Sequence, residues 1–265
     1  MAYQHLGIER NKDGVAIVTL NRPSKLNALS IELMLEIERV ADELRDDVET
    51  RAVIFTGAGK YFTAGADLTD PARAQLQSAP LLARQRAIQL GQRMAAKLHA
   101  IPQITIAAIN GGALGGGAVI VSALDFRIGA EGCFVSYPEI NLGMNLSWYG
   151  LPLCVRLIGP SRAKRMVILG RKEPAHTLLE WGFLDEIVPP EDLMGRARGL
   201  AAEYAAQPPI AAQMIKRSVN TVAGAMDQAL MHMDTDQFLL TNFSGDFREG
   251  VSAFLEKRPP AFTGE

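Results

Sequence analysis

The sequence has few of the residues that build metal centres and disulfide frameworks. Its 265 residues include two cysteines, Cys133 and Cys154, and four histidines, and no histidine neighbours a cysteine. The cysteines lack the spacing of zinc ligands, and two thiols do not make a disulfide framework. We therefore expect no metal site.

Strong charge and long apolar stretches are also missing. The net charge of −2 gives no electrostatic basis for binding nucleic acid or an anionic membrane. No apolar run reaches the roughly 18 residues of a membrane span. Residues 1–6 lack the basic region and apolar core of a signal peptide. A cytoplasmic location, with no nucleic acid and no membrane as partner, is the resulting expectation.

What is present is the composition of a globular protein with a sizeable core, 48% hydrophobic and 21% charged. The length suits one large domain, or one domain with a small appendage. Apolar runs predict strands that alternate with helices, which favours an α/β core with right-handed crossovers. The predicted strands are 15–20, 52–56, 104–109, 125–129, 133–137 and 185–188, and the predicted helices begin at Ser30 (as N-cap), 81, about 116 and 151.

Two further segments have a distinct character. Residues 69–80 read as a mobile loop between strand and helix. The helical tail after about Pro208 is too apolar to remain solvated, so we expect it to pack on the core or on a neighbouring subunit. Its apolar residues are Met214, Ile215, Val219, Met226, Leu230, Met233 and Phe238.

Two glycine-bearing segments, 57–68 and 110–117, each follow a strand-like apolar run. Small residues let a ligand approach the backbone closely, and free N–H groups at a helix start can hold negative charge. Two such donors converging on one thioester oxygen would form an oxyanion hole. Taken singly, either segment is better read as a tight turn, whereas the shared strand–glycine–helix context favours an acyl-thioester enzyme.

Other glycine motifs do not fit. Gly59-Lys60 is not a phosphate loop, because Ile54 stands where that motif needs glycine and Tyr61 where it needs serine or threonine. The 111–117 cluster does not give the G-x-G-x-x-G of a dinucleotide fold, and no G-x-S-x-G elbow supports a serine hydrolase.

Glu139 is the candidate general base. It follows Pro138 and is flanked by the apolar Ile140 and Leu142. In a pocket, desolvation would raise the pKa of this carboxyl, as a base working near neutrality requires. The alternative from composition is an exposed loop acid.

Motifs along nearly the whole chain resemble the crotonase family, also called the enoyl-CoA hydratase/isomerase superfamily. In their order and spacing, these motifs are specific. They are Leu20-Asn21-Arg22-Pro23 with Lys25-Leu26-Asn27-Ala28-Leu29, Ala64-Gly65-Ala66-Asp67-Leu68, Asn110-Gly111 to Gly117, Ser122 to Ile128, Pro138-Glu139-Ile140 with Leu142-Gly143, and Glu249-Gly250 with Phe254 to Arg258.

The resemblance implies an α/β spiral of ββα units over residues 1–207 and a C-terminal helical trimerisation region over 208–265. It implies a homotrimer or homohexamer that binds an acyl-CoA, with no cofactor besides the coenzyme A of the substrate. The oxyanion donors would be the backbone N–H groups of Ala66 and Gly116. By motif position, the residues along the CoA are Lys25, Leu26, Ala28, Ala64, Asp67 and Leu68, with Phe254 and Lys257 commonly supplied by a neighbouring subunit.

One departure from the family pattern bears on the reaction. Hydratases of this family hold water between two glutamates, but the position of the first is Val119 here, and bulky Leu146 to Tyr149, including Trp148, replace a small-residue stretch. A single acid, Glu139, in apolar surroundings resembles the enoyl-CoA isomerases, where one glutamate moves a proton from C2 to C4 in a dry site. The alternatives are an enoyl-CoA hydratase, another CoA chemistry such as thioester hydrolysis or decarboxylation, and a catalytically weak acyl-CoA binding protein. The stretch 70–82 is expected to shape the acyl pocket.

Overall fold

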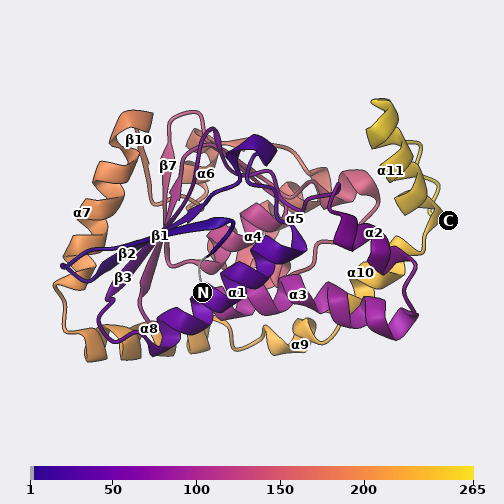
Figure 1. The fold of residues 1–265 in the computed structure, drawn as a ribbon. Coiled ribbons are helices and arrows are strands. Elements are labelled where there is room, and N and C mark those ends of the chain that lie inside the picture. Colours follow the sequence, from indigo (N-terminus) through magenta and orange to yellow (C-terminus); the bar gives the residue numbers. More distant parts are fainter. Residues whose placement is uncertain (1–2) are drawn as a thin grey trace.

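The chain builds two β-sheets, and Figure 1 labels strands of the larger one. The computed structural model describes residues 3–265, so Met1 and Ala2, which belong to the segment expected not to be a signal peptide, lie outside it. The six-stranded sheet has the order β1 (Leu6–Arg10), β2 (Val15–Leu20), β3 (Ala52–Gly57), β5 (Ile104–Ile109), β7 (Phe126–Ala130) and β10 (Glu186–Val188). The four-stranded sheet has the order β4 (Tyr61–Thr63), β6 (Gly112–Leu114), β8 (Phe134–Ser136) and β9 (Glu173–Pro174).

From β3 to β8 consecutive strands enter different sheets, which makes this part of the chain a spiral. The pairs β3–β4, β5–β6 and β7–β8 each give one strand to the large sheet and one to the small sheet, and helices lead to the next pair. Neighbouring strands of successive turns are parallel. The predicted α/β spiral of ββα units is therefore confirmed.

Helices cover both faces of the large sheet. The helices are α1 (Ile31–Asp46), α2 (Pro71–Gln77), α3 (Leu81–His99), α4 (Gly116–Ala123), α5 (Gly150–Leu169), α6 (Ala175–Glu180), α7 (Leu193–Ala205), α8 (Pro209–Ala223), α9 (Gln228–Met231), α10 (Asp234–Asn242) and α11 (Gly245–Glu256), with short 3-10 turns η1 (Pro23–Lys25), η2 (Pro138–Leu142) and η3 (Pro190–Asp192). Successive strand residues point to opposite faces, so Val15 and Ile17 pack toward α7 while Ala16 and Val18 pack toward α1, α3 and α4.

The first long helix follows the sequence pattern closely. Ser30 is its N-cap, and the Ser30 Oγ accepts a hydrogen bond from the N–H of Leu33 at 3.2 Å. The apolar side chains of Leu33 and Ile37 are fully buried, and burying such a side chain contributes roughly 1.5–3 kcal/mol. Leu35 lies on the outer face of the helix and is 49% exposed.

The segment 69–80 is not the loop that its sequence suggested. Residues 71–77 form α2, whose N-cap Asp70 accepts a hydrogen bond from the N–H of Ala72 and has Pro71 after it. Pro71 at the first helical position and an aspartate cap are both strong start signals, and α2 packs on α3.

The C-terminal helices wrap around the spiral without entering its core. Helix α10 packs on α3, and α11 packs on η2 of the same chain. In α8 Lys216 is the only buried residue, while most of the apolar side chains point outward. Within residues 3–265 no helix is long and apolar enough to cross a bilayer. The division into units at residue 207 remains a prediction.

Candidate active site

The two glycine-bearing segments lie side by side. Strand β4 pairs in parallel with β6, with Tyr61 opposite Gly112. Gly65 has φ +86°, and a Cβ on it would lie 2.6 Å from the carbonyl oxygen of Leu114. Only glycine permits this approach. The backbone after β4 therefore runs against the backbone that leads into α4.

Each segment presents a free backbone donor. Leu29 forms an isolated parallel bridge with Ala66, in which the N–H of Leu29 donates to Gly65 at 2.8 Å and its carbonyl accepts from Asp67 at 3.0 Å. In such a pair the N–H of Ala66 points to the opposite side. Gly116 is the first residue of α4, where an N–H has no acceptor inside the helix. Across residues 3–265 neither N–H has a hydrogen-bond acceptor.

Glu139 lies next to this pair of donors. A Cβ on Gly115, which has φ +52°, would be 2.8 Å from Glu139 Oε1, so the missing side chain leaves room for the carboxylate. Glu139 Oε2 is buried and has no hydrogen-bond partner in the described chain. Burial raises the pKa of Glu139 to about 7, although its own backbone N–H lowers it somewhat. The carboxyl can therefore exchange a proton near neutral pH.

Val119 and Trp148 are apolar side chains packed around the first turns of α4. Val119 belongs to the hydrophobic core, and its Cγ2 would be 2.8 Å from a Cβ on Gly150. The Trp148 indole lies so close to Gly116 and Gly91 that a side chain on either glycine would overlap it. Position 119 therefore offers packing and no proton exchange.

A carboxylate from the C-terminal helices holds the turn that carries Trp148. Both Trp148 and Tyr149 have positive φ, of 62° and 68°, which is uncommon for large side chains. The buried Asp234 of α10 accepts a hydrogen bond from the N–H of Tyr149 at 3.4 Å. Burial raises the pKa of Asp234 to about 6, against hydrogen bonds from Tyr149 and Trp148 that lower it. Asp234 thus positions the wall beside Gly116.

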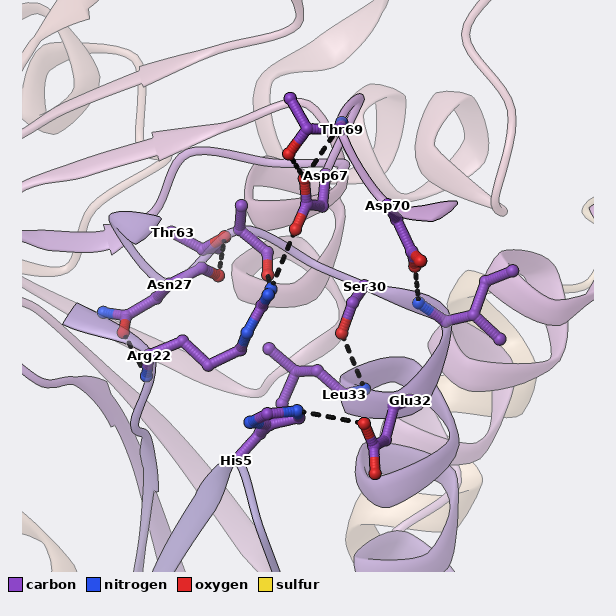
Figure 2. Close-up of polar contacts among 12 residues, drawn as sticks. His5, Arg22, Asn27, Ser30, Glu32, Leu33, Thr63, Asp67, Thr69 and Asp70 are labelled. Atoms are coloured by element: carbon purple, nitrogen blue, oxygen red, sulfur yellow. Dashed lines mark hydrogen bonds and ion pairs between the residues drawn. The ribbon is translucent and has the colours of Figure 1, made fainter. Parts of the chain in front are cut away.

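A buried polar network fixes the loop around Ala66 (Figure 2). Asp67 accepts hydrogen bonds from the N–H and hydroxyl of Thr69, and its other oxygen lies 3.1 Å from Arg22 Nη1. Burial favours a higher pKa for Asp67, but these hydrogen bonds lower it overall. Thr63 donates to the carbonyl of Asn27 and accepts from the N–H of Gly65. Arg22 and Thr63 were missed as site residues, although Arg22 stands in a quoted motif.

The residues expected along CoA gather at one edge of this loop. The N–H of Ala64 donates to the carbonyl of Leu26 at 2.9 Å, which joins η1 to the end of β4. Lys25, Leu26 and Leu68 are exposed there, and Ala28 is partly exposed. Their contact with CoA remains a prediction.

Phe254 and Lys257 lie elsewhere, at the end of α11. Both are exposed. Helix α11 is pressed onto η2, since a Cβ on Gly143 would be 2.7 Å from the backbone of Asp246 and one on Gly250 would be 2.6 Å from that of Leu142. This region therefore covers the back of the turn that carries Glu139, and a role for Phe254 and Lys257 at a CoA site remains a prediction.

Comparisons with known proteins agree with this architecture. A family model described as enoyl-CoA hydratase/isomerase matches residues 10–265. Crotonyl-CoA hydratase of Syntrophomonas wolfei is 31% identical over 263 residues, covering 99% of each chain. The 1,2-epoxyphenylacetyl-CoA isomerase of Escherichia coli K12 is 32% identical over 252 residues, covering 95% of this chain and 96% of the other. The crystal structure of carnitinyl-CoA hydratase from Mycobacterium avium superposes with a TM-score of 0.86 at 30% identity over 100% of both chains.

The spiral and the facing glycine segments define a crotonase-fold enzyme. The chain belongs to the enoyl-CoA hydratase/isomerase family, as its motifs implied. The relatives include proteins named as hydratases and one named as an isomerase, so membership leaves the particular reaction open.

The N–H of Gly116 is expected to contribute strongly to turnover. A proline at this position would overlap Trp148, so the cleaner change is a backbone ester, which replaces the N–H of Gly116 by oxygen and adds no side chain. Losing one oxyanion donor typically lowers kcat about 10²–10³-fold. The measurement is kcat at saturating substrate, with an ester at Gly117, in the same helical turn, as the matched control. Equal losses at the two positions would mean that α4 as a whole was damaged, and Gly116 would then have no special part.

Proposed function

We propose that the protein moves the double bond of a 3-enoyl-CoA to the 2 position, with Glu139 as the only acid/base. The supporting observation is the isolation of this carboxyl. Glu139 Oε2 is buried without a hydrogen-bond partner among the described residues, and burial is the main cause of the raised pKa. A hydratase of the two-glutamate type would place a second, coupled carboxylate beside it.

In the proposed reaction one proton leaves C2 of the substrate and returns at C4. The Glu139 carboxylate takes a proton from C2 of the 3-enoyl thioester, and the electrons move onto the thioester oxygen as a dienolate. The N–H groups of Ala66 and Gly116 donate to that oxygen. The carboxylic acid then returns the same proton to C4, which leaves the 2-enoyl product and a regenerated carboxylate. The apolar Val119 and Trp148 keep water from the dienolate.

Hydration of a 2-enoyl-CoA is the second candidate. It is favoured by the similarity to a protein named crotonyl-CoA hydratase along nearly the full length. In that reaction Glu139 would have to activate the water without a second acid, because Val119 cannot exchange a proton. The proposal needs no cofactor beyond the coenzyme A of the substrate.

Product mass separates the two reactions. Incubating the protein with matched 3-enoyl-CoA and 2-enoyl-CoA thioesters should convert the 3-enoyl compound to a product of unchanged mass with the absorbance of a conjugated thioester. Rapid addition of one water to the 2-enoyl compound would establish the hydratase instead. If C2 protons exchanged with solvent but no product formed, the protein would form the enolate without completing either reaction.

We further propose that α8 forms the interface of a homotrimer, or of a homohexamer made from two trimers. Six apolar side chains of its outer face and the following turn are each more than half exposed, namely Ile210, Met214, Ile215, Val219, Val222 and Met226. An apolar groove of about 620 Å³ runs along the same helix. An apolar area of this extent favours a covering subunit.

Light scattering at micromolar protomer concentration is expected to give a trimeric or hexameric mass. Val222→Asp, at the most exposed of these apolar positions, should shift the mass toward the monomer because a charge would be buried at the interface. Val48→Asp is the control, since Val48 is 88% exposed against 79% for Val222 and lies in the turn after α1, outside the six apolar positions. A monomeric wild type would contradict the proposal.

A further inference from the structure

Helix α2 carries an arginine, two of whose nitrogen atoms are buried without a hydrogen-bond partner in the part of the chain that the structure describes. Arg73 lies in the first turn of α2, and its Nε and Nη2 atoms are buried without a hydrogen-bond partner among the described residues. A buried donor left unsatisfied is costly, and more so when charged. Such a group in a native fold calls for a partner that arrives from outside the chain.

The acids nearest to Arg73 are already engaged. Asp70 and Asp67 both act on its charge from a distance, but neither hydrogen-bonds to it. Asp70 accepts from the N–H of Ala72 at 2.9 Å. It also accepts from the N–H of Ile31 at 2.7 Å (Figure 2). Asp67 is held by Thr69 and Arg22, as described above. The guanidinium therefore keeps free donors for a ligand.

Trp148 connects Arg73 to the reacting centre. The Arg73 Cζ lies 6.0 Å from the centroid of the Trp148 ring. The same ring lies directly against Gly116, whose N–H is the proposed oxyanion donor. Arg73 and Gly116 therefore lie near the same indole ring, and in the proposed function the thioester oxygen would be bound at Gly116. Of the residues expected along CoA, Lys25 and Leu26 lie at η1, whereas Asp67 is close enough to act on the charge of Arg73.

We propose that Arg73 binds a carboxylate carried by the acyl chain, so that the substrates are acyl-CoA thioesters with a second, distal carboxyl group. This deepens the proposed function and rests on it for the position of the thioester. A guanidinium presents two parallel N–H donors that match a carboxylate. The phosphates of CoA share this anionic chemistry, but the place of Arg73 beside Trp148 favours the acyl end.

Binding of saturated thioesters tests the idea without turnover. Succinyl-, glutaryl- and adipoyl-CoA are compared by calorimetry with butyryl-, valeryl- and hexanoyl-CoA, which match them in length without the carboxylate. The wild type should bind at least one carboxylated ligand about 10–100-fold more tightly than its neutral match, as expected for a charge-assisted hydrogen bond. Arg73→Met should remove this preference and leave the neutral ligands unchanged. Arg86→Met, at an exposed position of α3, should retain it.

The remaining outcomes are decisive in either direction. Equal binding of carboxylated and neutral ligands by the wild type would overturn the proposal. An equal loss for all ligands and for free CoA in Arg73→Met would assign the arginine to a phosphate instead. If Arg73→Met does not fold, Arg73→Lys keeps the charge without the paired donors and should lose most of the preference. Because no reaction is required, a protein that proves to be a hydratase by product mass can still confirm or refute the carboxylate site.

Discussion

Glu139→Gln is expected to abolish proton transfer while ligand binding persists. The amide keeps the size of the side chain beside Gly115 but cannot act as a base. General acid–base catalysis typically contributes about 10²–10⁴-fold, and a group that performs both transfers should lie near 10⁴. The measurement is kcat for the 3-enoyl-CoA, together with exchange of C2 protons in heavy water. Retained exchange would show that another base operates.

The pH dependence of the wild type supplies an independent check. The working form of Glu139 is the carboxylate, and its pKa is raised by burial to about 7. The rate should therefore fall as the pH drops below about 7. Rising pH has the opposite effect on the stability of the fold. A carboxyl with a raised folded pKa makes the protein less stable as pH rises from about 4.5 to about 7. Glu139→Gln should be free of that loss and relatively more stable at pH 8.

Lys216→Ala is expected to lower the free energy of unfolding by about 3–5 kcal/mol, the usual result of breaking a buried ion pair. The ammonium lies 2.6 Å from Asp125 Oδ2 and 2.7 Å from the carbonyl oxygen of Gln103, and its side chain is 6% exposed. Asp125 also accepts hydrogen bonds from the N–H and hydroxyl of Thr105. Denaturant unfolding at one fixed protomer concentration measures the effect, because assembly would otherwise change the apparent stability.

Arg217→Ala is the matched control for Lys216. It is the next residue of α8 and is exposed, so its removal should change stability by no more than about 0.5 kcal/mol. Asp125→Asn, which keeps the Thr105 contacts but loses the charge, should recover part of the deficit when combined with Lys216→Ala. If Lys216→Ala has the same free energy of unfolding as the wild type, the apolar contacts of α8 stabilise this helix and the ion pair does not.

The large sheet could be predicted from sequence because its strands are buried on both faces. Val15 to Leu20 and Ile104 to Ile109 form continuous apolar runs, and the observed strands have those same bounds. The small sheet could be predicted only in part, because the expected strand 133–137 contains β8 (Phe134–Ser136) but β4, β6 and β9 were not expected. Its strands have two or three residues, and β6 consists of Gly112, Ala113 and Leu114, which have no strand pattern of their own. They become strands only because the spiral places them against one another.

For the site, the sequence indicated which motif residues to consider, but it did not indicate which distant residues contact them. The glycine segments indicate donors through their strand–glycine–helix context, and the Pro-Glu motif indicates the base. Arg73 gave no signal, because an arginine inside an apparent loop is ordinary. Its significance depends on burial beside Trp148, which only the folded chain creates. Asp234 was equally invisible, since it meets the backbone of residue 149 across 85 positions of sequence.

Because Asp234 contacts the turn of Trp148, the parts of the site are completed in a fixed order during synthesis. A ribosome releases the chain from its N-terminus, and the spiral can begin to fold while the last helices are still unmade. The proposed donors of Ala66 and Gly116 and the proposed base Glu139 all lie in this earlier part. The turn of Trp148 acquires its anchor only when Asp234 emerges. A nascent chain therefore contains these groups before the turn of Trp148 is fixed beside them. A polypeptide that stops before α10 would contain the same groups but would lack the hydrogen bond from Tyr149 to Asp234.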